Sequence, residues 1–300
     1  MKIAILSDIH ANATALEQVL GAIQDVQQTW FLGDAVDRGP QSEPVIRWWM
    51  DLNQQAGARW LMGNHDAMLA EILTPAEMET INAVHREDNQ FHRQEIQALP
   101  ELLDFVQENF TRQACEPQEV IQDGALYVLT HASLIDGLGL YTYVYSWKVE
   151  ITLPNEFTAL EKRCQNAGMP GIMLCGHTHV PMLCSAQRGG AGEWEIRSEK
   201  VLAGHTYPLD PSRLWIINPG SVGQPRDLDK RAAFAVLDAA KRSVTFHRVE
   251  YDWRSVAREL IRLGRHQIYP QVLRDAAIDS ITPDEWIQHY QMAKEESDEL

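Results

Sequence analysis

The chain has 300 residues, of which 45% are hydrophobic and 23% are charged, as in a globular protein whose core needs no disulfide staples. The net charge is -16, from 26 basic and 42 acidic residues, and no block of Lys or Arg stands out, which argues against nucleic-acid binding through a basic face. No apolar run approaches the roughly 20 residues of a membrane span, and the run over 3–6 is too short for a secretion signal. We therefore expect a cytoplasmic protein without membrane association; no oligomeric state follows from these numbers.

The first third of the chain alternates strand, polar loop and helix. Residues 3–6 are short and apolar and end in a polar turn, which predicts a buried strand. Asn12 is a suitable cap for the helix that follows, in which apolar residues recur at helical spacing up to Ile23. Strands are expected again at 29–32 and 59–62, with an amphipathic helix between them. In sheets built this way, ligands bind beyond the carboxyl ends of the strands.

The pattern becomes helical from Ala67 to about Gln113. Within it, Thr74-Pro75-Ala76-Glu77 has the form of a capping box with Pro at the first helical position. Two interpretations stay open for this insertion: helices packed on the sheet, or a cap over the site that selects the substrate. The histidines outside the motifs described below are interpreted as core or surface residues: His85, His92, His205, His247, His266 and His289.

Strands resume in the second half of the chain, at 125–129, 172–175, 214–217, 232–237 and 243–249, the last two as a hairpin. From Trp253 the pattern is helical again, with a second capping box at 282–285 and an acidic tail from Glu295. The predicted organisation is one domain over residues 1–252, carrying a helical insertion at about 67–113, and a helical C-terminal extension at 253–300 packed on it.

Five short polar segments end or directly follow apolar runs, where strand ends are expected. They are Asp8-Ile9-His10, Gly33-Asp34-Ala35-Val36-Asp37-Arg38, Gly63-Asn64-His65-Asp66, Thr130-His131 and Gly176-His177-Thr178-His179. Carboxylate, imidazole and carboxamide ligands together suit Mn, Fe, Zn or Co better than Mg or Ca, which prefer oxygen ligands. One such segment alone carries little information, because Asp-x-His after a strand is commonly a turn. Five of them in this order predict a dinuclear metal site.

The order D-x-H, G-D-x-x-D, G-N-H-D, H, G-H-x-H resembles the calcineurin-like metallophosphoesterase superfamily. The stretch from Gly33 to Gly39 is closest in style to the phosphoprotein phosphatases and the related diadenosine tetraphosphatases. The resemblance runs from Asp8 to His179, and the later strands would complete the fold. It implies an α/β protein with a four-layer αββα sandwich of two mixed sheets.

The same resemblance implies a cofactor and a role for each motif residue. The cofactor would be two divalent transition-metal ions, with Mn as the first expectation and Fe, Zn, Co or Ni as alternatives. The implied ligands form two sets of three with one bridging carboxylate: Asp8, His10 and His179; Asn64, His131 and His177; and Asp34 between them. His65 would protonate the leaving oxygen, Asp37 would orient His65, and Arg38 would bind phosphate.

Charge counting agrees with a phosphate site. Two divalent ions carry four positive charges, of which Asp8, Asp34 and a bridging hydroxide cancel three, and the remaining charge attracts phosphate. Metals ~3.5–4 Å apart can activate the water and hold the phosphoryl oxygens for in-line attack. We therefore expect a phosphoesterase using a metal-bridging hydroxide. Its substrate would be a phosphomonoester, a phosphoprotein or a dinucleoside polyphosphate, so its partner is a small phosphorylated molecule or a phosphoprotein.

Two alternative functions stay open. One is a phosphodiesterase of the same superfamily, which the Gly-His-x-His ending favours. The other is a non-catalytic metal-binding scaffold, against which the presence of His65, Asp37 and Arg38 argues.

Several residues beside the motifs are expected to support the site rather than to act in it. Asp66 should bond loop amides, and the turn-rich segment 218–223 should be structural, with Arg226 as a second anion contact. The four cysteines have no regular spacing and are expected to be reduced, buried thiols. Cys175 and Cys184 flank the last histidine pair, but that segment already offers two imidazoles, so we do not expect them to bind metal.

Overall fold

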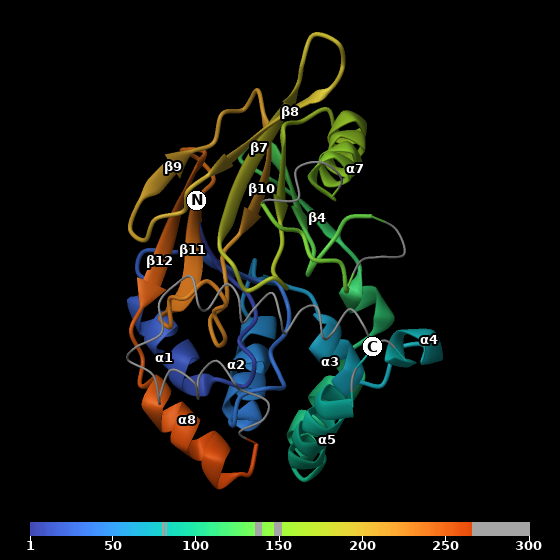
Figure 1. The fold of residues 1–300 in the computed structure, drawn as a ribbon, viewed down its shortest axis with the longest axis vertical. Coiled ribbons are helices and arrows are strands. Elements are labelled where there is room, and N and C mark those ends of the chain that lie inside the picture. Colours follow the sequence, from blue (N-terminus) through green and yellow to red (C-terminus); the bar gives the residue numbers. More distant parts are fainter. Residues whose placement is uncertain (80, 82, 136–139, 147–151, 266–300) are drawn as a thin grey trace.

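The computed structural model of the protein describes residues 1–79, 81, 83–135, 140–146 and 152–265. Its strands form two six-stranded sheets, in the orders β3-β2-β1-β11-β12-β9 and β4-β5-β6-β10-β7-β8. Both sheets are mixed: β1 pairs in parallel with β2 and antiparallel with β11, and β10 pairs in parallel with β6 and antiparallel with β7. Figure 1 shows the sheets in the upper part of the view and most of the helices below them.

The strands have the following bounds: β1 Lys2–Leu6, β2 Gln28–Phe31, β3 Arg59–Trp60, β4 Gln118–Gln122, β5 Ala125–Leu129, β6 Gly171–Leu174, β7 Met182–Arg188, β8 Trp194–Glu199, β9 Thr206–Pro208, β10 Leu214–Asn218, β11 Ala232–Asp238 and β12 Ser243–Val249. The helices are α1 Ala13–Ala22, α2 Ser42–Asn53, α3 Asn64–Leu69, α4 Pro75–Glu79, α5 Ala83–Gln97, α6 Pro100–Asn109, the 3-10 helix η1 Arg112–Cys115, α7 Thr152–Ala167 and α8 Trp253–Arg262.

Every strand predicted from the sequence overlaps an observed strand. The structure adds β4, β7, β8 and β9, of which three lie at sheet edges, and the helix α7. Edge strands are half exposed and carry polar side chains, so their sequences lack the apolar run of a buried strand; Trp194–Glu199 is an example. The strand predicted at 59–62 is shorter than expected, because Met62 leaves the sheet and bonds Ala114.

Three apolar clusters divide the molecule into four layers. Ile3 and Ile5 of β1 pack with Tyr127 and Leu129 of β5 between the two sheets. On the outer face of the first sheet, Phe31 packs against Trp49 of α2, in a cluster that also contains buried residues of α1 and α6. On the outer face of the second sheet, strand residues pack against the buried side chains of α7: Leu153, Phe157, Leu160 and Cys164. The predicted αββα sandwich is therefore confirmed.

The two sheets bring the ends of several parallel strands to one edge. β1, β2 and β3 run parallel in the first sheet, and β5, β6 and β10 run parallel in the second. Hydrogen bonds join the loops that follow these strands across the sheets: the amide of His177, after β6, donates to Asp8, after β1. All five polar motifs of the sequence lie in or directly beside these loops, at the edge where ligands are expected.

Helices α4 and α5 extend from the sandwich on the side of α3, and α8 lies beside α1 (Figure 1). The capping box predicted at the start of α4 is present: Thr74 Oγ1 accepts from the Glu77 amide, and the Glu77 carboxylate accepts from Thr74. The predicted domain limits, 1–252 and 253–300, stay predictions. The second capping box, the acidic tail, His266 and His289 lie outside the described residues. Within the described part of the chain, no helix has both the length and the apolar character that a bilayer span requires.

Candidate active site

Seven residues of the predicted site share an unusual backbone conformation. Each has a positive φ, in the left-handed region that residues other than glycine rarely adopt. They are Asp8 (53°), His10 (49°), Asp34 (59°), Asp37 (66°), Arg38 (69°), His177 (65°) and His179 (60°). Such a conformation costs about 1 kcal/mol or more per residue and persists only where the surrounding structure imposes it. Strain of this kind collects at functional sites, and here it turns the side chains of separate loops toward one point.

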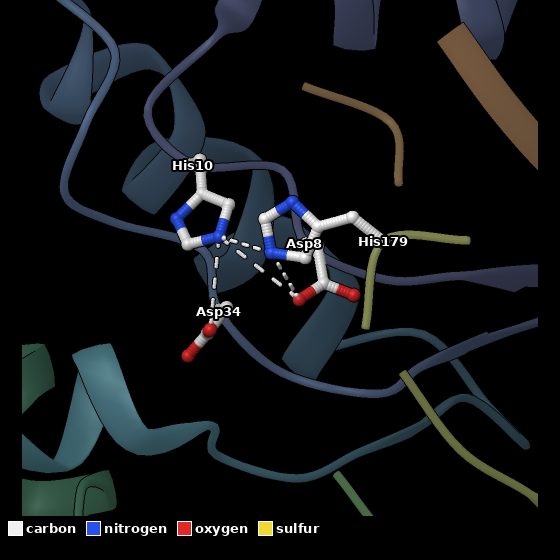
Figure 2. A group of neighbouring side chains, drawn as sticks. All are labelled: Asp8, His10, Asp34 and His179. Atoms are coloured by element: carbon white, nitrogen blue, oxygen red, sulfur yellow. Dashed lines mark hydrogen bonds and ion pairs between the residues drawn. The ribbon is translucent and has the colours of Figure 1, made fainter. Parts of the chain in front are cut away.

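Four buried side chains form the first group: Asp8, His10, Asp34 and His179 (Figure 2). The Nε2 atom of His179 lies 3.1 Å from Nε2 of His10 and 3.2 Å from Oδ1 of Asp8. His10 Nε2 also lies 3.7 Å from Oδ2 of Asp34. The donor atoms of two imidazoles and two carboxylates thus lie within 4.8 Å of one another, close enough to contact one ion.

The second group contains Asp34, His131 and His177, all buried. His131 Nε2 lies 3.3 Å from Oδ2 of Asp34 and 3.2 Å from Oδ1 of Asn64. The rings of His131 and His177 have centroids 5.1 Å apart. Asp34 belongs to both groups, so the structure brings all seven residues that were expected to bind metal into one centre.

Backbone carbonyls set the tautomers of three of these histidines. Nδ1 of His10 bonds Val36 O at 3.0 Å, that of His131 bonds Leu32 O at 2.8 Å, and that of His179 bonds Gln224 O at 2.6 Å. Because a carbonyl can only accept, each Nδ1 carries a proton, and each ring with a deprotonated Nε2 presents the lone pair of that atom to the centre. This is how proteins orient metal-binding histidines.

The buried polar atoms of the centre also favour a cation. Asp8 Oδ1 and His177 Nε2 are buried and have no hydrogen-bond partner among the described residues. Burial and the neighbouring imidazoles of His179 and His65 hold the pKa of His10 well below its ordinary value. Burial acts against charge at His131 as well, but the Asp34 carboxylate outweighs it and raises the pKa of His131 to about 9. A divalent ion would compete with that proton. The donor set therefore fits metal ions.

Asp66 holds the loop that carries Asp34. Its carboxylate accepts from the amides of Asp34 at 2.7 Å, Ala35 at 2.9 Å and Gly63 at 3.0 Å, which is the structural role predicted for it. Burial, followed by the adjacent Asp34 carboxylate, raises the pKa of Asp66 to about 7, while these amides favour its charged form. Gly63 itself is required by close approach, because a Cβ there would overlap Oδ1 of Asp34.

The loop after β10 supports the opposite side of the centre. Asn218 Nδ2 donates to Gly176 O at 2.6 Å, and Ser221 Oγ donates to Asp8 O at 2.7 Å. Gly176 is packed so closely that a Cβ would overlap Ser7 and meet Oδ2 of Asp8 at 2.8 Å. The structural role expected for 218–223 is therefore confirmed. Arg226, at the end of this loop, contributes with burial to lowering the pKa of His179 to about 4.

Asp37, Arg38 and His65 form a third group next to the first. His65 Nδ1 lies 2.7 Å from Oδ2 of Asp37, its Nε2 lies 3.3 Å from Nη2 of Arg38, and its ring centroid is 5.0 Å from that of His10. Helix α5 completes the group, because Asn89 Nδ2 donates to both oxygens of Asp37, at 3.0 and 2.9 Å. His65 is thus held at one nitrogen and faces the guanidinium of Arg38 with the other.

Burial changes the pKa values of both members of the hydrogen-bonded pair His65 and Asp37. Burial, and then the positive charge of Arg38, keep the pKa of His65 well below its ordinary value. Burial raises the pKa of Asp37 well above its ordinary value. Burial thus disfavours the charged form of each of these two side chains. A phosphate dianion at Arg38 would cancel the repulsion that lowers the pKa of His65 and so favour the protonated imidazole.

The calcineurin-like phosphoesterase superfamily domain matches residues 1–242. The chain belongs to this superfamily. It is a hydrolase of a metal-dependent superfamily, and the clustered His and Asp side chains agree with that dependence. The family and the enzymatic activity predicted from the sequence are therefore confirmed.

Three known proteins are similar to this phosphoesterase. An uncharacterized protein of Methanocaldococcus jannaschii is 24% identical over 267 residues, which cover 87% of this chain and 92% of the relative. The structure of a metallophosphoesterase from Sphaerobacter thermophilus is similar with a TM-score of 0.68 and 28% identity, over 91% of this chain and 98% of that one. A symmetrical bis(5'-nucleosyl)-tetraphosphatase of Chromobacterium violaceum is 28% identical over 138 residues, covering 45% of this chain and 44% of the relative.

Sequence reasoning missed several residues around the site of this phosphoesterase. Tyr143 stacks on His177, with ring centroids 4.3 Å apart. His85, interpreted as a core or surface residue, lies with its ring centroid 5.8 Å from that of His65, which places it beside the third group. A signal was present in the helix, since four polar residues of α5 recur at spacings of three and four and so share one face: His85, Asp88, Asn89 and His92.

The four cysteines are buried, as predicted. All four cysteines are free and buried, and among the described residues none belongs to a group that could hold a metal ion. Burial raises the pKa of Cys184 to about 11 and that of Cys115 to about 12, which keeps both thiols protonated.

Proposed function

We propose that this phosphoesterase binds two divalent metal ions at the edge of its sheets and hydrolyses phosphate esters there. The observation that carries the proposal is the position of Asp34. Its Oδ2 atom lies 3.7 Å from Nε2 of His10 and 3.3 Å from Nε2 of His131, so one carboxylate joins two imidazole-containing groups. A shared carboxylate between two such groups is the arrangement that a dinuclear centre requires.

Each ion would then have its own ligands besides Asp34. The proposed sets are those implied by the sequence motifs: Asp8, His10 and His179 for one ion, and Asn64, His131 and His177 for the other. Imidazole and carboxylate together suit first-row transition metals, so Mn is proposed first and Fe, Zn, Co or Ni as alternatives. Bound there, the ions would supply an activated water and Lewis acids for the phosphoryl oxygens.

The third group would bind the phosphate and move the proton. The guanidinium of Arg38 is a planar fork that matches two phosphate oxygens, and it is held beside His65. His65 would donate a proton from Nε2 to the leaving oxygen, while Asp37 holds its Nδ1–H and Asn89 holds Asp37. No covalent bond between the protein and the substrate is needed for this route.

The proposed substrate is a small phosphorylated molecule or a phosphoprotein, with an accessible phosphoryl group. The pairing of Arg38 with a proton donor favours phosphomonoesters, including phosphoproteins, and dinucleoside polyphosphates. The partial likeness to a bis(5'-nucleosyl)-tetraphosphatase supports the last class. The cytoplasmic location expected from the sequence stays a prediction.

The test uses metal-loaded protein on a substrate panel. We expect Mn-loaded protein to hydrolyse p-nitrophenyl phosphate and at least one of a phosphopeptide and a dinucleoside tetraphosphate. The His65→Ala variant should lose this activity, and His205→Ala, which changes an exposed histidine, should keep it. Preferential cleavage of cyclic nucleotides and a model diester would favour the phosphodiesterase alternative. Failure on every substrate by protein shown to contain metal would contradict the proposal and revive the scaffold.

A further inference from the structure

Arg265 follows α8 and reaches back into the protein interior. Its side chain is 7% exposed although it carries a full positive charge. Nη1 donates to the carbonyl of Gly39 at 3.0 Å, and Nη2 forms an ion pair with Oδ1 of Asp88. The guanidinium also lies over the ring of Phe91, 4.5 Å from its centroid. A buried arginine bonded on several sides is costly to place, so its partners indicate what it stabilises.

Two of these partners belong to or bond the loop that carries Arg38, the arginine proposed to bind phosphate. Asp88 pairs with Arg265 through one oxygen, and its other oxygen, Oδ2, accepts from the amide of Arg38 at 2.6 Å. The next residue, Gly39, gives its carbonyl to Arg265 directly. The Arg38-Gly39 segment is therefore held at its first amide and its last carbonyl. Between them Arg38 keeps a φ of 69°, a conformation that needs such support.

The same contacts determine where α5 lies relative to the site. Asp88 bonds the backbone of Arg38, and its neighbour Asn89 bonds Asp37 and the carbonyl of His65. One helix thus orders both halves of the third group, and Arg265 fixes that helix through Asp88. His92 Nε2 lies 2.6 Å from Nη2 of Arg265 on the same face.

A metal ion is a weaker interpretation of this cluster. Asp37, Asp88 and His92 are close enough to offer three ligand atoms. However, Asp88 and His92 already face the guanidinium of Arg265, which supplies the positive charge that an ion would bring. Asp37 in turn is occupied by Asn89 and His65. The cluster is a buried charge network organised around an arginine.

We propose that Arg265 is a positioning residue of the phosphoester site, which acts through Asp88 and Gly39 to hold Arg38 and His65 in their working geometry. This inference rests on the proposed function of Arg38. Arg265 lies beyond residues 1–242, the part that the superfamily domain covers. The segment after β12 thus contributes to the site of this protein from outside the shared domain.

The first test measures the loop itself and needs no activity. Hydrogen exchange of metal-free protein should show the Arg38 amide exchanging about 10-fold faster in Arg265→Gln than in the wild type, because Asp88 loses its charged partner and its hold on that amide. Arg265→Lys should have a smaller effect. Arg262→Gln, which removes an exposed arginine paired with Glu259 on α8, is the matched control. Exchange in β11 reports whether each variant is folded. Unchanged exchange at Arg38 in folded Arg265→Gln protein would overturn the proposal.

The second test separates positioning from general stability. With Mn-loaded protein and p-nitrophenyl phosphate, Arg265→Gln should lower kcat/KM roughly 10- to 100-fold, the scale of small misplacements of catalytic groups. In an Arg38→Ala background the same change should have a smaller effect, because one of the two residues that it positions is gone and only its action on His65 remains. An equal loss in both backgrounds would assign Arg265 a merely structural role. If wild-type protein is inactive on all substrates, the proposed function fails, and the exchange measurement still decides whether Arg265 holds the loop.

Discussion

The candidate site consists of two parts that are held in different ways. The seven proposed metal ligands form one part, the ligand group (Asp8, His10, Asp34, Asn64, His131, His177 and His179), which is oriented mainly by backbone atoms: carbonyls bond the Nδ1 atoms of three histidines, and close glycines define the space. The transfer group (Asp37, Arg38 and His65) is oriented mainly by side chains of α5 and by Arg265. The loops at the strand ends of the sandwich hold the ligand group, whereas α5 and the segment after α8 hold the transfer group. We therefore expect variants to affect metal binding and turnover separately.

The largest effect should come from removing the shared carboxylate. Asp34→Asn removes the negative charge that both imidazole groups face, so we expect the protein to lose bound metal and, with it, activity. Metal content after Mn loading and dialysis is the measurement. Asp37→Asn is the matched control, since it makes the same change in the transfer group and should keep its metal. Equal metal content in the two variants would contradict the division into two parts.

His65→Ala should lower turnover by ~10²–10⁴, the usual scale for loss of general acid catalysis, while metal content stays near that of the wild type. Steady-state kinetics with metal analysis of the same samples checks both halves of this expectation. Loss of metal along with turnover would mean that the transfer group also supports the ligand group.

A smaller effect is expected from Asn89→Ala. Asp37 then loses both amide hydrogen bonds from α5, and His65 loses part of its orientation, so turnover should fall roughly 10-fold with metal retained. The exposed neighbour Gln90 provides the control Gln90→Ala. If Asn89→Ala is as active as this control, α5 does not set the geometry of Asp37.

The smallest effect is expected outside both groups, in the first turn of α4. Glu77 caps α4 and pairs with Arg112, and the hydrogen bond from Arg112 contributes most to lowering the pKa of Glu77 to about 2. A lowered pKa in the folded state gives stability that is present above the ordinary pKa of 4.5 and is lost as the pH falls toward about 2. Glu77→Gln should therefore cost ~1 kcal/mol at pH 7 and progressively less below pH ~4.5. Urea unfolding at several pH values measures this difference, and turnover at pH 7 should not change. A difference that does not depend on pH would show that the charge of Glu77 contributes nothing.

The class of fold, and the seven side chains that the structure brings into one centre, could be predicted from local sequence patterns. Short apolar runs that end in Asp, His, Asn or Gly are local patterns, and parallel strands carry such endings to one edge. The close packing at Gly63 and Gly176 and the role of Asp66 explain why the motifs contain these residues. The same locality explains why the edge strands β4, β8 and β9 were missed, since half-exposed strands have little apolar pattern.

The transfer group is held by contacts between segments that are distant in the sequence. Asp88 lies 50 residues from Arg38, and Arg265 lies 226 residues from Gly39, so no local spacing connects them. Their contacts depend on how α5 and the segment after α8 pack against the loop after β2, and that packing is a property of the whole fold. The same holds for Tyr143 on His177. The proposed ligands lie in short motifs directly after the strands that position them. The residues of the buried charge network lie in segments that are far apart in the sequence and meet only after the chain has folded.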